Sequence, residues 1–291
     1  MDLSMSLNYL CRRRGAGENR DLESAAALCR EAGFRYVDYT PDFIHEDWEE
    51  RARRDREILD RVGIAVEQTH APFNRYRHYP AEAFLTYYQR VFAASKIVGA
   101  KYVVVHADEY RTTDHYDEEE ITAFAYDYLA PYVEYAAGNG MCVAIENLFE
   151  DVVAHCPQID GKSRFTARVG ELKGLIERFH TPEVVCCWDF GHAKCAFGNE
   201  KMLDAFREMS RYIACTHVHD NYYGRDLHLM PFLGEIDWET HMEHFRKIGY
   251  PGKLSFEFVY GRFPDKLLPV WLQSVRAVGE YLVGLYDGSE N

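Results

Sequence analysis

Apolar residues follow two alternating patterns along the chain, one typical of buried strands and one typical of amphipathic helices. Eight short runs form the candidate strands: MSLNYL, FRYVDYT, IAVEQTH, YVVVHAD, MCVAIEN, VVCCWDF, YIACTHVH and LSFEFV. The longer segments between them place apolar residues at helical spacing, as in DLESAAALCREAG and AFLTYYQRVFAASKIVGA. Apolar strands that alternate with helices are typical of a parallel sheet.

The number of strand–helix units favours a closed barrel over an open sheet. Eight units in 291 residues fit an α/β fold, a (β/α)₈ barrel that forms one domain over residues 1–291. No GxGxxG motif follows the first strand, which argues against a dinucleotide-binding sheet. No Ser-, Pro- or Gly-rich linker divides the chain, and the longest connection, about 148–166, is a candidate lid.

Polar residues with metal-binding chemistry follow six of the candidate strands. The carboxyl ends of the strands in such a barrel share one rim, where functional residues gather. The residues at or beyond these strand ends are His70, His106, Glu146, Asp189, His192, His217, Asp226, His228 and Glu257. Each one alone is commonly a capping or packing residue. Converging buried carboxylates would repel one another without a cation, so the set predicts a divalent-metal site.

The other histidines are expected to have lesser roles. His219 lies two residues beyond His217 on the same strand face, and we expect it to support the ligands. The remaining histidines are expected in loops or helices, without a part in the chemistry: His45, His78, His115, His155, His180, His241 and His244. Asp226 and His228 are expected in the loop that follows the seventh strand.

Composition narrows the class of protein further. The chain has 33 Lys and Arg against 47 Asp and Glu, a net charge of −14, which disfavours a broad nucleic-acid-binding surface. Its eight cysteines lack CxxC spacing and several lie in apolar runs, so we expect reduced core thiols. No run approaches the ~18 apolar residues of a membrane span, and the N-terminal order of charges is not that of a signal peptide. A cytoplasmic protein is expected.

Six segments resemble the sugar phosphate isomerase/epimerase group of the xylose isomerase-like TIM barrels, a group related to the family 2 AP endonucleases: THAPF, VVVHAD, IEN, WDFGHA, HVHDN followed by DLH, and FEF. The resemblance implies a TIM barrel with one divalent cation, commonly manganese, magnesium, cobalt or zinc. It implies that the cation is held by Glu146, Asp189, His217 and Glu257, and that His192 contacts the substrate.

The endonuclease branch of the resemblance implies a larger metal site. That branch holds three zinc ions, and its pattern matches all nine strand-end residues, adding His70, His106, Asp226 and His228 to the quartet and His192. The segment THAPFNRYRHYP lacks the Asn-Leu element of that branch, and IENLFEDVVAHC lacks its Gly-Gln-Gly stretch. The tail PFLGEIDW resembles the sugar enzymes instead. Further metal ions, or substrate contacts at these four residues, therefore stay open, whereas DNA cleavage and nucleic-acid partners are disfavoured.

The strand-end residues and the resemblance together predict an enzyme of carbohydrate metabolism. We expect a metal-dependent isomerase or epimerase that converts a sugar, sugar phosphate or related polyol through an enediolate. Glu146 and Glu257 would act as base and acid, and His192 would orient the reacting oxygens. The alternatives are a di- or trinuclear metal hydrolase, such as a phosphodiesterase, a dehydratase or lyase with the same enolate chemistry, and a barrel that only binds its ligand.

Charged and aromatic residues near the rim are further candidates for substrate binding. Rim cations that would hold a phosphate group are Arg75, Arg111, Lys194, Arg225 and Arg262, and aromatic residues that would face a sugar ring are Trp48, Tyr76 and Trp188. We expect Trp188 to pack in the core instead, because side chains alternate along a strand and Asp189 faces the site. The identity of the sugar and the metal, and the oligomeric state, are left open.

Overall fold

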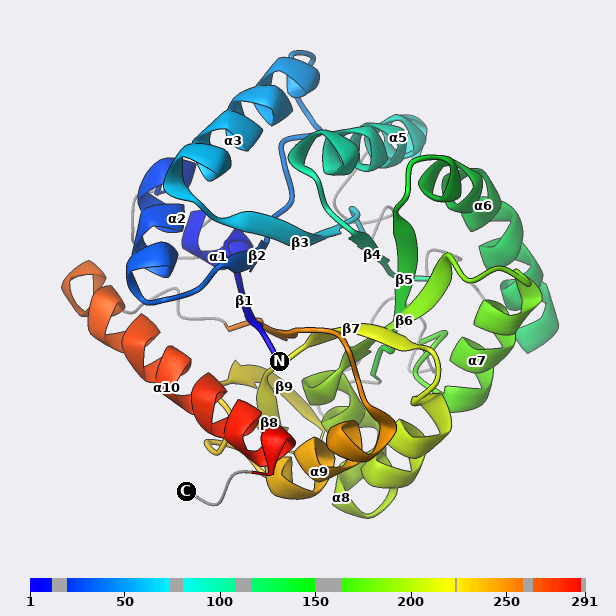
Figure 1. Ribbon diagram of the computed structural model, residues 1–291. Helices are drawn as coiled ribbons and strands as arrows, with labels where there is room; N and C mark the ends of the chain where they lie inside the picture. The colour runs from blue at the N-terminus through cyan, green and yellow to red at the C-terminus, as the bar shows by residue number, and fades with distance from the viewer. Residues whose placement is uncertain are drawn as a thin grey trace.

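The computed structural model describes residues 1–11, 20–73, 81–107, 117–149, 164–222, 224–258 and 264–288. Eight parallel strands form a ring, and helices surround it (Figure 1). The strands are β1 Leu3–Ser6, β2 Tyr36–Asp38, β3 Ala65–His70, β4 Tyr102–Val105, β5 Cys142–Glu146, β6 Val184–Asp189, β7 Ile213–His217 and β10 Leu254–Phe256. Each strand overlaps one of the eight runs expected from the sequence.

The ring closes between its first and last strands in the sheet order β10-β1-β2-β3-β4-β5-β6-β7. Val218, just beyond β7, forms a parallel bridge with Phe256 of β10. Its backbone N–H donates to the Ser255 carbonyl at 2.7 Å, and its carbonyl accepts from the Glu257 N–H at 3.2 Å. The predicted (β/α)₈ barrel is therefore confirmed, and the carboxyl ends of all eight strands lie at one rim.

Helices connect the strands and form the outer layer. They are α1 Asn8–Cys11, α2 Leu22–Glu31, α3 Trp48–Val62, α5 Ala81–Val98, α6 Glu118–Gly138, α7 Val169–Arg178, α8 Phe190–Met209, α9 Trp238–Ile248 and α10 Leu268–Asp287, with a 3₁₀ turn at Asp265–Leu267. Aspartates cap several of them: the Asp21 side chain accepts from the Ser24 N–H at 2.8 Å, and Asp237 accepts from the Thr240 N–H at 3.1 Å. Gly249 ends α9 with a left-handed φ of 65°, which glycine adopts without strain.

The core lies mainly between the strands and the helices, as expected for apolar strands covered by amphipathic helices. Trp188 is fully buried there, with its ring centroid 5.5 Å from that of Phe206, so the expectation of core packing is confirmed. A second, smaller apolar cluster includes Tyr102, Cys187 and Cys215. Cys187 and Cys215 are buried thiols without a disulfide bond, as the sequence predicts.

Two local predictions are wrong. The first strand ends at Ser6, because Cys11 N–H bonds to the Leu7 carbonyl at 2.8 Å and the chain turns into helix α1. Asp226 and His228 lie on a strand rather than in a loop. The segment after β7 pairs with itself as an antiparallel hairpin, β8 Asp220–Tyr222 with β9 Arg225–Leu229, around Gly224 at a φ of 68°.

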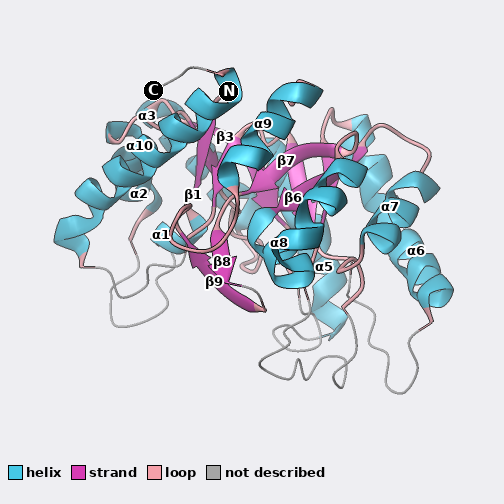
Figure 2. Cartoon of the chain, turned by 90° about the horizontal axis from the view of Figure 1, so that it is seen from below, coloured by secondary structure: helices cyan, strands magenta, loops and turns pink. Residues whose placement is uncertain are grey.

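The hairpin lies at the end of the barrel opposite to both chain termini (Figure 2). This is the rim that carries the strand-end residues, so the hairpin brings Asp226 and His228 to the mouth of the barrel. Most of the candidate lid, residues 150–163, lies outside the described residues. The two sides of that connection are joined where Leu148 N–H bonds to the Thr166 carbonyl at 3.1 Å and the Thr166 hydroxyl donates to the Glu146 carbonyl at 2.9 Å.

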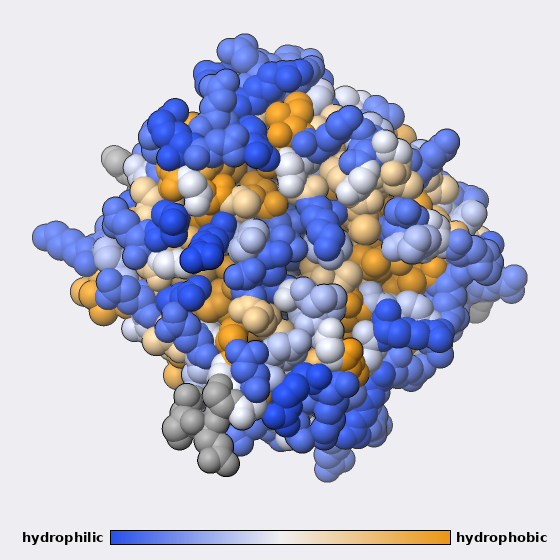
Figure 3. All heavy atoms as spheres, viewed as in Figure 1, coloured by the Kyte–Doolittle hydropathy of each residue, from blue (hydrophilic) through white to orange (hydrophobic). Residues whose placement is uncertain are grey.

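The outer surface is mainly hydrophilic, with scattered apolar groups, on the face shown in Figure 3. This agrees with the 47 acidic and 33 basic residues of the chain, most of which must lie in water. In the described part of the chain, no helix has both the length and the apolar character to span a membrane.

Candidate metal centre

The four residues of the predicted quartet meet at the carboxyl ends of β5, β6, β7 and β10, and the central one is His217. Its Nδ1 lies 2.9 Å from Glu146 Oε1 and 3.6 Å from Asp189 Oδ2. The same nitrogen lies 3.5 Å from Glu257 Oε2. Glu146, Asp189 and His217 are buried, whereas Glu257 keeps partial access to solvent. Parallel strands in a closed ring thus bring four distant sequence positions into contact.

Two further predicted residues face the same glutamate, His70 at the end of β3 and His106 just beyond β4. His106 Nε2 lies 2.9 Å and His70 Nε2 3.2 Å from Glu146 Oε2. The other ring nitrogen of His70 lies 2.7 Å from the carbonyl oxygen of Ala71. A carbonyl only accepts hydrogen bonds, so in neutral His70 the proton is on Nδ1 and the lone pair of Nε2 faces Glu146.

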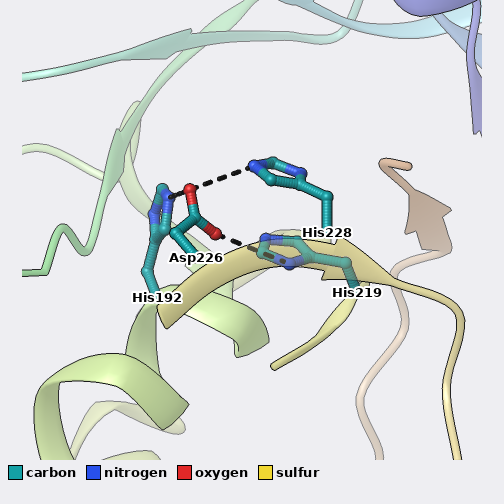
Figure 4. Close-up of side chains that lie close together, drawn as sticks. All are labelled: His192, His219, Asp226 and His228. Atoms are coloured by element: carbon teal, nitrogen blue, oxygen red, sulfur yellow. Dashed lines mark ion pairs between the residues drawn. The ribbon is translucent and has the colours of Figure 1, made fainter. Parts of the chain in front are cut away.

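The remaining predicted residues form a cluster beside Asp189. This aspartate ends β6 and caps helix α8, where its Oδ1 accepts a 2.6 Å hydrogen bond from the His192 N–H. Asp226 Oδ2 lies 3.2 Å from His228 Nε2 and 3.9 Å from His192 Nε2 (Figure 4). His192 Nδ1 also lies 3.3 Å from Glu146 Oε1. His192 therefore joins this cluster to the one around Glu146.

Burial and pairing shift the pKa values of these groups strongly. Burial opposes ionisation of Asp189 and Asp226, but neighbouring imidazoles, first His192 for Asp189 and His228 for Asp226, lower the pKa of both carboxyls. Burial also opposes protonation of His192 and His228, yet Asp189 and Asp226 raise their pKa to about 10 and about 9, respectively. Protons on the imidazoles thus balance the carboxylates in the metal-free protein, and a divalent cation can replace them.

The donor atoms converge in four overlapping groups, within each of which they lie no more than 4.8 Å apart. The groups are His192, His219, Asp226 and His228; His70, His106 and Glu146; Glu146, Asp189 and His192; and Asp189, His217 and Glu257. Imidazole nitrogen and carboxylate oxygen are ligands that zinc, manganese and cobalt accept, so the donor set fits a divalent transition metal. The predicted quartet spans two of these groups, and His217 contacts its three other members.

Asp38 at the end of β2 was missed by the sequence reasoning. Its Oδ2 lies 3.3 Å from His217 Nε2, the ring nitrogen opposite to the one that faces the carboxylates. Gln68 donates to the same oxygen at 3.3 Å. Asp38 lies near the end of the run FRYVDYT. A search for polar residues at the ends of the candidate strands could therefore have found it as well. No hydrogen bond joins the two groups, so Asp38 acts on His217 as a buried charge 3.3 Å from its ring.

His219 and Asn221 also lie closer to the site than their sequence positions suggest. His219 Nε2 lies 3.0 Å from the Asp189 carboxylate, which is the supporting contact expected for it. Its ring also stacks on that of His228, with centroids 4.0 Å apart and planes 9° apart. The Asn221 side-chain oxygen accepts from the N–H groups of Leu227 and His228 at 2.6 and 3.1 Å, which holds the hairpin in place.

The candidate substrate-binding residues have different surroundings. Lys194 was expected in a rim loop, but it is buried in α8, where its Nζ bonds to Asn199 Oδ1 at 2.6 Å and to Glu235 Oε2 at 2.9 Å. Its charge is thus already paired. Arg225 is exposed at the start of β9, and Trp48 is half-buried at the start of α3. Arg75, Tyr76, Arg111 and Arg262, like His78, His115 and His155, lie outside the described residues.

The barrel and its rim of histidines and carboxylates define a class of protein that the comparisons identify directly. The chain belongs to the xylose isomerase-like TIM barrel family, whose model matches residues 26–278. The family resemblance drawn from the strand-end motifs is therefore confirmed.

Individual relatives add detail to this assignment. The uncharacterised protein y4fM of Sinorhizobium fredii is 27% identical over 274 residues, which cover 81% of this chain and 80% of that protein. The fold is similar to that of 3-keto-D-glucoside 4-epimerase, YcjR, from E. coli, with a TM-score of 0.69, 16% identity and coverage of 95% and 99% of the two chains. It is also similar to that of a D-psicose 3-epimerase, with a TM-score of 0.74, 13% identity and coverage of 98% and 100%.

Proposed function

We propose that the protein is a metal-dependent isomerase or epimerase that acts on a sugar, sugar phosphate or related polyol through an enediolate intermediate. The observation that carries the proposal is the placement of Glu146 and Glu257. Both contact His217 Nδ1, yet they come from β5 and from the end of β10, on different sides of the ring. Two carboxylates that approach one point from different strands can exchange protons with both sides of a bound substrate.

The surroundings of the two glutamates suit proton transfer. Burial raises the pKa of Glu146, but His217 and His106 hold it well below its usual range, so this carboxylate is ionised, as a base must be, while the same lowering reduces its proton affinity. Glu257 is the more accessible partner and would return a proton to the neighbouring carbon or to the opposite face. His192, whose Nδ1 lies 3.3 Å from Glu146 Oε1, would orient the reacting oxygens.

We propose that Glu146, Asp189, His217 and Glu257 hold the cation of this reaction. When bound, a divalent cation there supplies positive charge that stabilises the negative charge on the substrate oxygens. Aromatic rings next to the histidines would form the walls of the site: Phe73 stacks on His106 at 4.5 Å, and Phe149 lies 4.9 Å from the His192 ring. Such faces suit the apolar CH groups of a sugar.

A metal hydrolase is the second candidate, because the donor groups extend beyond the quartet to His70, His106, Asp226 and His228. Two or three ions at these positions would suit phosphodiester hydrolysis. A dehydratase or lyase would share the proton-abstraction step of the leading proposal and differ in its product.

Hydrogen exchange in deuterated water tests the reaction. The purified protein, loaded with manganese, cobalt or zinc, is incubated with a panel of ketoses and ketose phosphates, and deuterium at the α-carbon is followed by NMR. Replacing Glu146→Gln or Glu257→Gln is expected to slow exchange by about 10²–10⁴-fold. Metal content is measured on the same samples, so that loss of the ion is separated from loss of the base.

The surface variant Glu243→Gln is the matched control and should exchange at the wild-type rate, since Glu243 pairs with Lys247 on the outer helix α9. A DNA duplex with an abasic site is assayed in parallel. Cleavage of the DNA without exchange on any sugar would support the hydrolase instead. Exchange without cleavage would support the enediolate chemistry, and the product would then separate epimerase, isomerase and dehydratase.

A further inference from the structure

Thr166, shortly before helix α7, holds a backbone conformation that threonine rarely adopts. Its φ is 68°, in the left-handed region, and the residue is buried. A β-branched side chain crowds its own backbone there, so the surrounding contacts must offset an energetic cost. Glycine adopts the same conformation without that cost. The contacts of the threonine hydroxyl show what this conformation achieves.

The contacts of Thr166 resemble one rung of a parallel sheet in which one hydrogen bond has been exchanged. In a regular parallel bridge opposite Asn147, the Thr166 N–H would donate to the Glu146 carbonyl and the Thr166 carbonyl would accept from the Leu148 N–H. The second of these bonds is present, at 3.1 Å. The first is made by the Thr166 hydroxyl instead, at 2.9 Å. The side chain thus takes the place of its own backbone donor.

The N–H group of Thr166 binds a buried carboxylate in place of the strand. It donates to Glu171 Oε2 at 3.0 Å, and Glu171 lies buried in the first turn of α7. The other oxygen of Glu171 lies 2.7 Å from Nη1 of Arg168, so the charge of the carboxylate is paired. With its N–H directed at α7 and its hydroxyl directed at β5, Thr166 joins the end of a strand to the start of a helix.

The strand end that Thr166 holds carries the base of the proposed reaction. Glu146 is the last residue of β5, and its Oε1 lies 2.9 Å from His217 Nδ1. The direction of that carboxylate depends on the backbone from which it projects. Thr166 contacts this backbone on both sides of Asn147, at the Glu146 carbonyl and at the Leu148 N–H.

On the basis of the proposed role of Glu146 as the base, we propose that Thr166 is a positioning residue: its hydroxyl fixes the end of β5 so that the Glu146 carboxylate is held at the reaction centre. Valine has nearly the same shape as threonine but no hydroxyl. In Thr166→Val the buried Glu146 carbonyl therefore loses its donor, and the strand end shifts to find another. A base displaced by about 1 Å can lower the rate by about 10²-fold.

Exchange kinetics of the metal-loaded full-length protein test the proposal. For the sugar that the wild type exchanges fastest, Thr166→Val is expected to lower kcat for α-carbon exchange by about 10²-fold, with KM within about threefold of the wild-type value. Thr166→Ser keeps the hydroxyl and should exchange at nearly the wild-type rate. Thr122→Val is the matched control and should match the wild type, because the Thr122 hydroxyl donates to the Glu118 carbonyl within the outer helix α6.

Crystal structures of the metal-free wild type, Thr166→Val and Thr166→Ser locate Glu146 without any sugar. In Thr166→Val, Glu146 Oε1 is expected beyond hydrogen-bonding distance of His217 Nδ1, and in Thr166→Ser it should stay at the 2.9 Å of the wild type. Should Thr166→Val not fold, Thr166→Gly replaces it in both measurements, because glycine adopts the left-handed conformation and lacks the hydroxyl.

An unmoved Glu146 in the variant without the hydroxyl would overturn the proposal. A displaced Glu146 with unchanged exchange in an active enzyme would overturn it as well. If the wild type exchanges no sugar, the proposed function fails, and the crystal structures alone decide whether Thr166 positions Glu146. Displacement of the carboxylate in Thr166→Val together with its retention in Thr166→Ser supports the positioning role.

Discussion

At the scale of single residues, the partner of each histidine decides which nitrogen faces the site. His217 is the central case, because its Nδ1 faces three carboxylates while its Nε2 lies 3.3 Å from Asp38. Asp38 itself is buried and receives a hydrogen bond from Gln68. Asp38 can therefore influence the His217 ring without belonging to the proposed metal-binding quartet.

Replacing Asp38→Asn is expected to weaken metal binding at the His217 site by about 10–100-fold, because the neutral amide supports the imidazole less strongly. Competition with a chromophoric chelator measures the affinity. Asp42→Asn is the control: its carboxylate makes an exposed contact with His45 at 2.7 Å, and metal affinity should not change. Equal affinities for wild type and Asp38→Asn would contradict an effect of the Asp38 charge on His217.

At the scale of elements, helix α8 and the hairpin β8–β9 approach each other closely. Asp189 ends β6, caps α8 and binds His219, so one carboxylate fixes both elements. Asp220 organises the segment that follows: it accepts hydrogen bonds from the N–H groups of Phe232 and Ile236 at 2.9 and 3.1 Å, and from the Trp238 indole at 2.9 Å. The hairpin is thus held at both of its ends.

Gly191→Ala is expected to lower the free energy of unfolding by about 1–3 kcal/mol, because the added methyl group must displace the His219 ring or the hairpin. Urea unfolding measures this change. Gly174→Ala in α7 is the matched control, since nothing lies within 4 Å of its added Cβ. That variant should be neutral or more stable by up to about 1 kcal/mol. Equal effects of the two substitutions would show that Gly191 has no special contact.

At the scale of the whole molecule, ring closure concentrates acids and bases that are spread over the chain. In the metal-free protein, the pKa values of about 10 for His192 and about 9 for His228 lie above the ordinary value of 6.5. Their pairing with carboxylates therefore stabilises the fold fully below about pH 6.5, and this contribution is lost as the pH rises through 9 to 10.

Binding of the cation by Glu146, Asp189, His217 and Glu257 near pH 7.5 is expected to release about one proton, because His217 must become neutral to act as a ligand. Apparent affinity should then fall about tenfold per released proton for each unit by which the pH is lowered. Calorimetric titration in buffers of different ionisation enthalpy counts the protons. His241→Asn, with its histidine on α9, should release the same number as the wild type. Binding without proton release would show that His217 is not a ligand.

The sequence by itself determined the alternation of strands and helices and the chemistry of the strand ends. Both are local properties: periodicity reports which faces are buried, and a strand end is visible where the apolar run stops at His70, Glu146 or Asp189. The barrel then follows, because eight parallel strands with covering helices close into one ring.

Only the tertiary structure decided which side chains meet. Asp38 faces His217 and His219 joins Asp226 because neighbouring strands and the hairpin bring them together. Lys194 turns away into an ion pair with Glu235, a contact between segments about forty residues apart. The hairpin itself depends on Asn221 and Asp220, whose hydrogen bonds form only once the chain has folded back. Such contacts depend on the distances between elements, which hydrophobic periodicity does not encode.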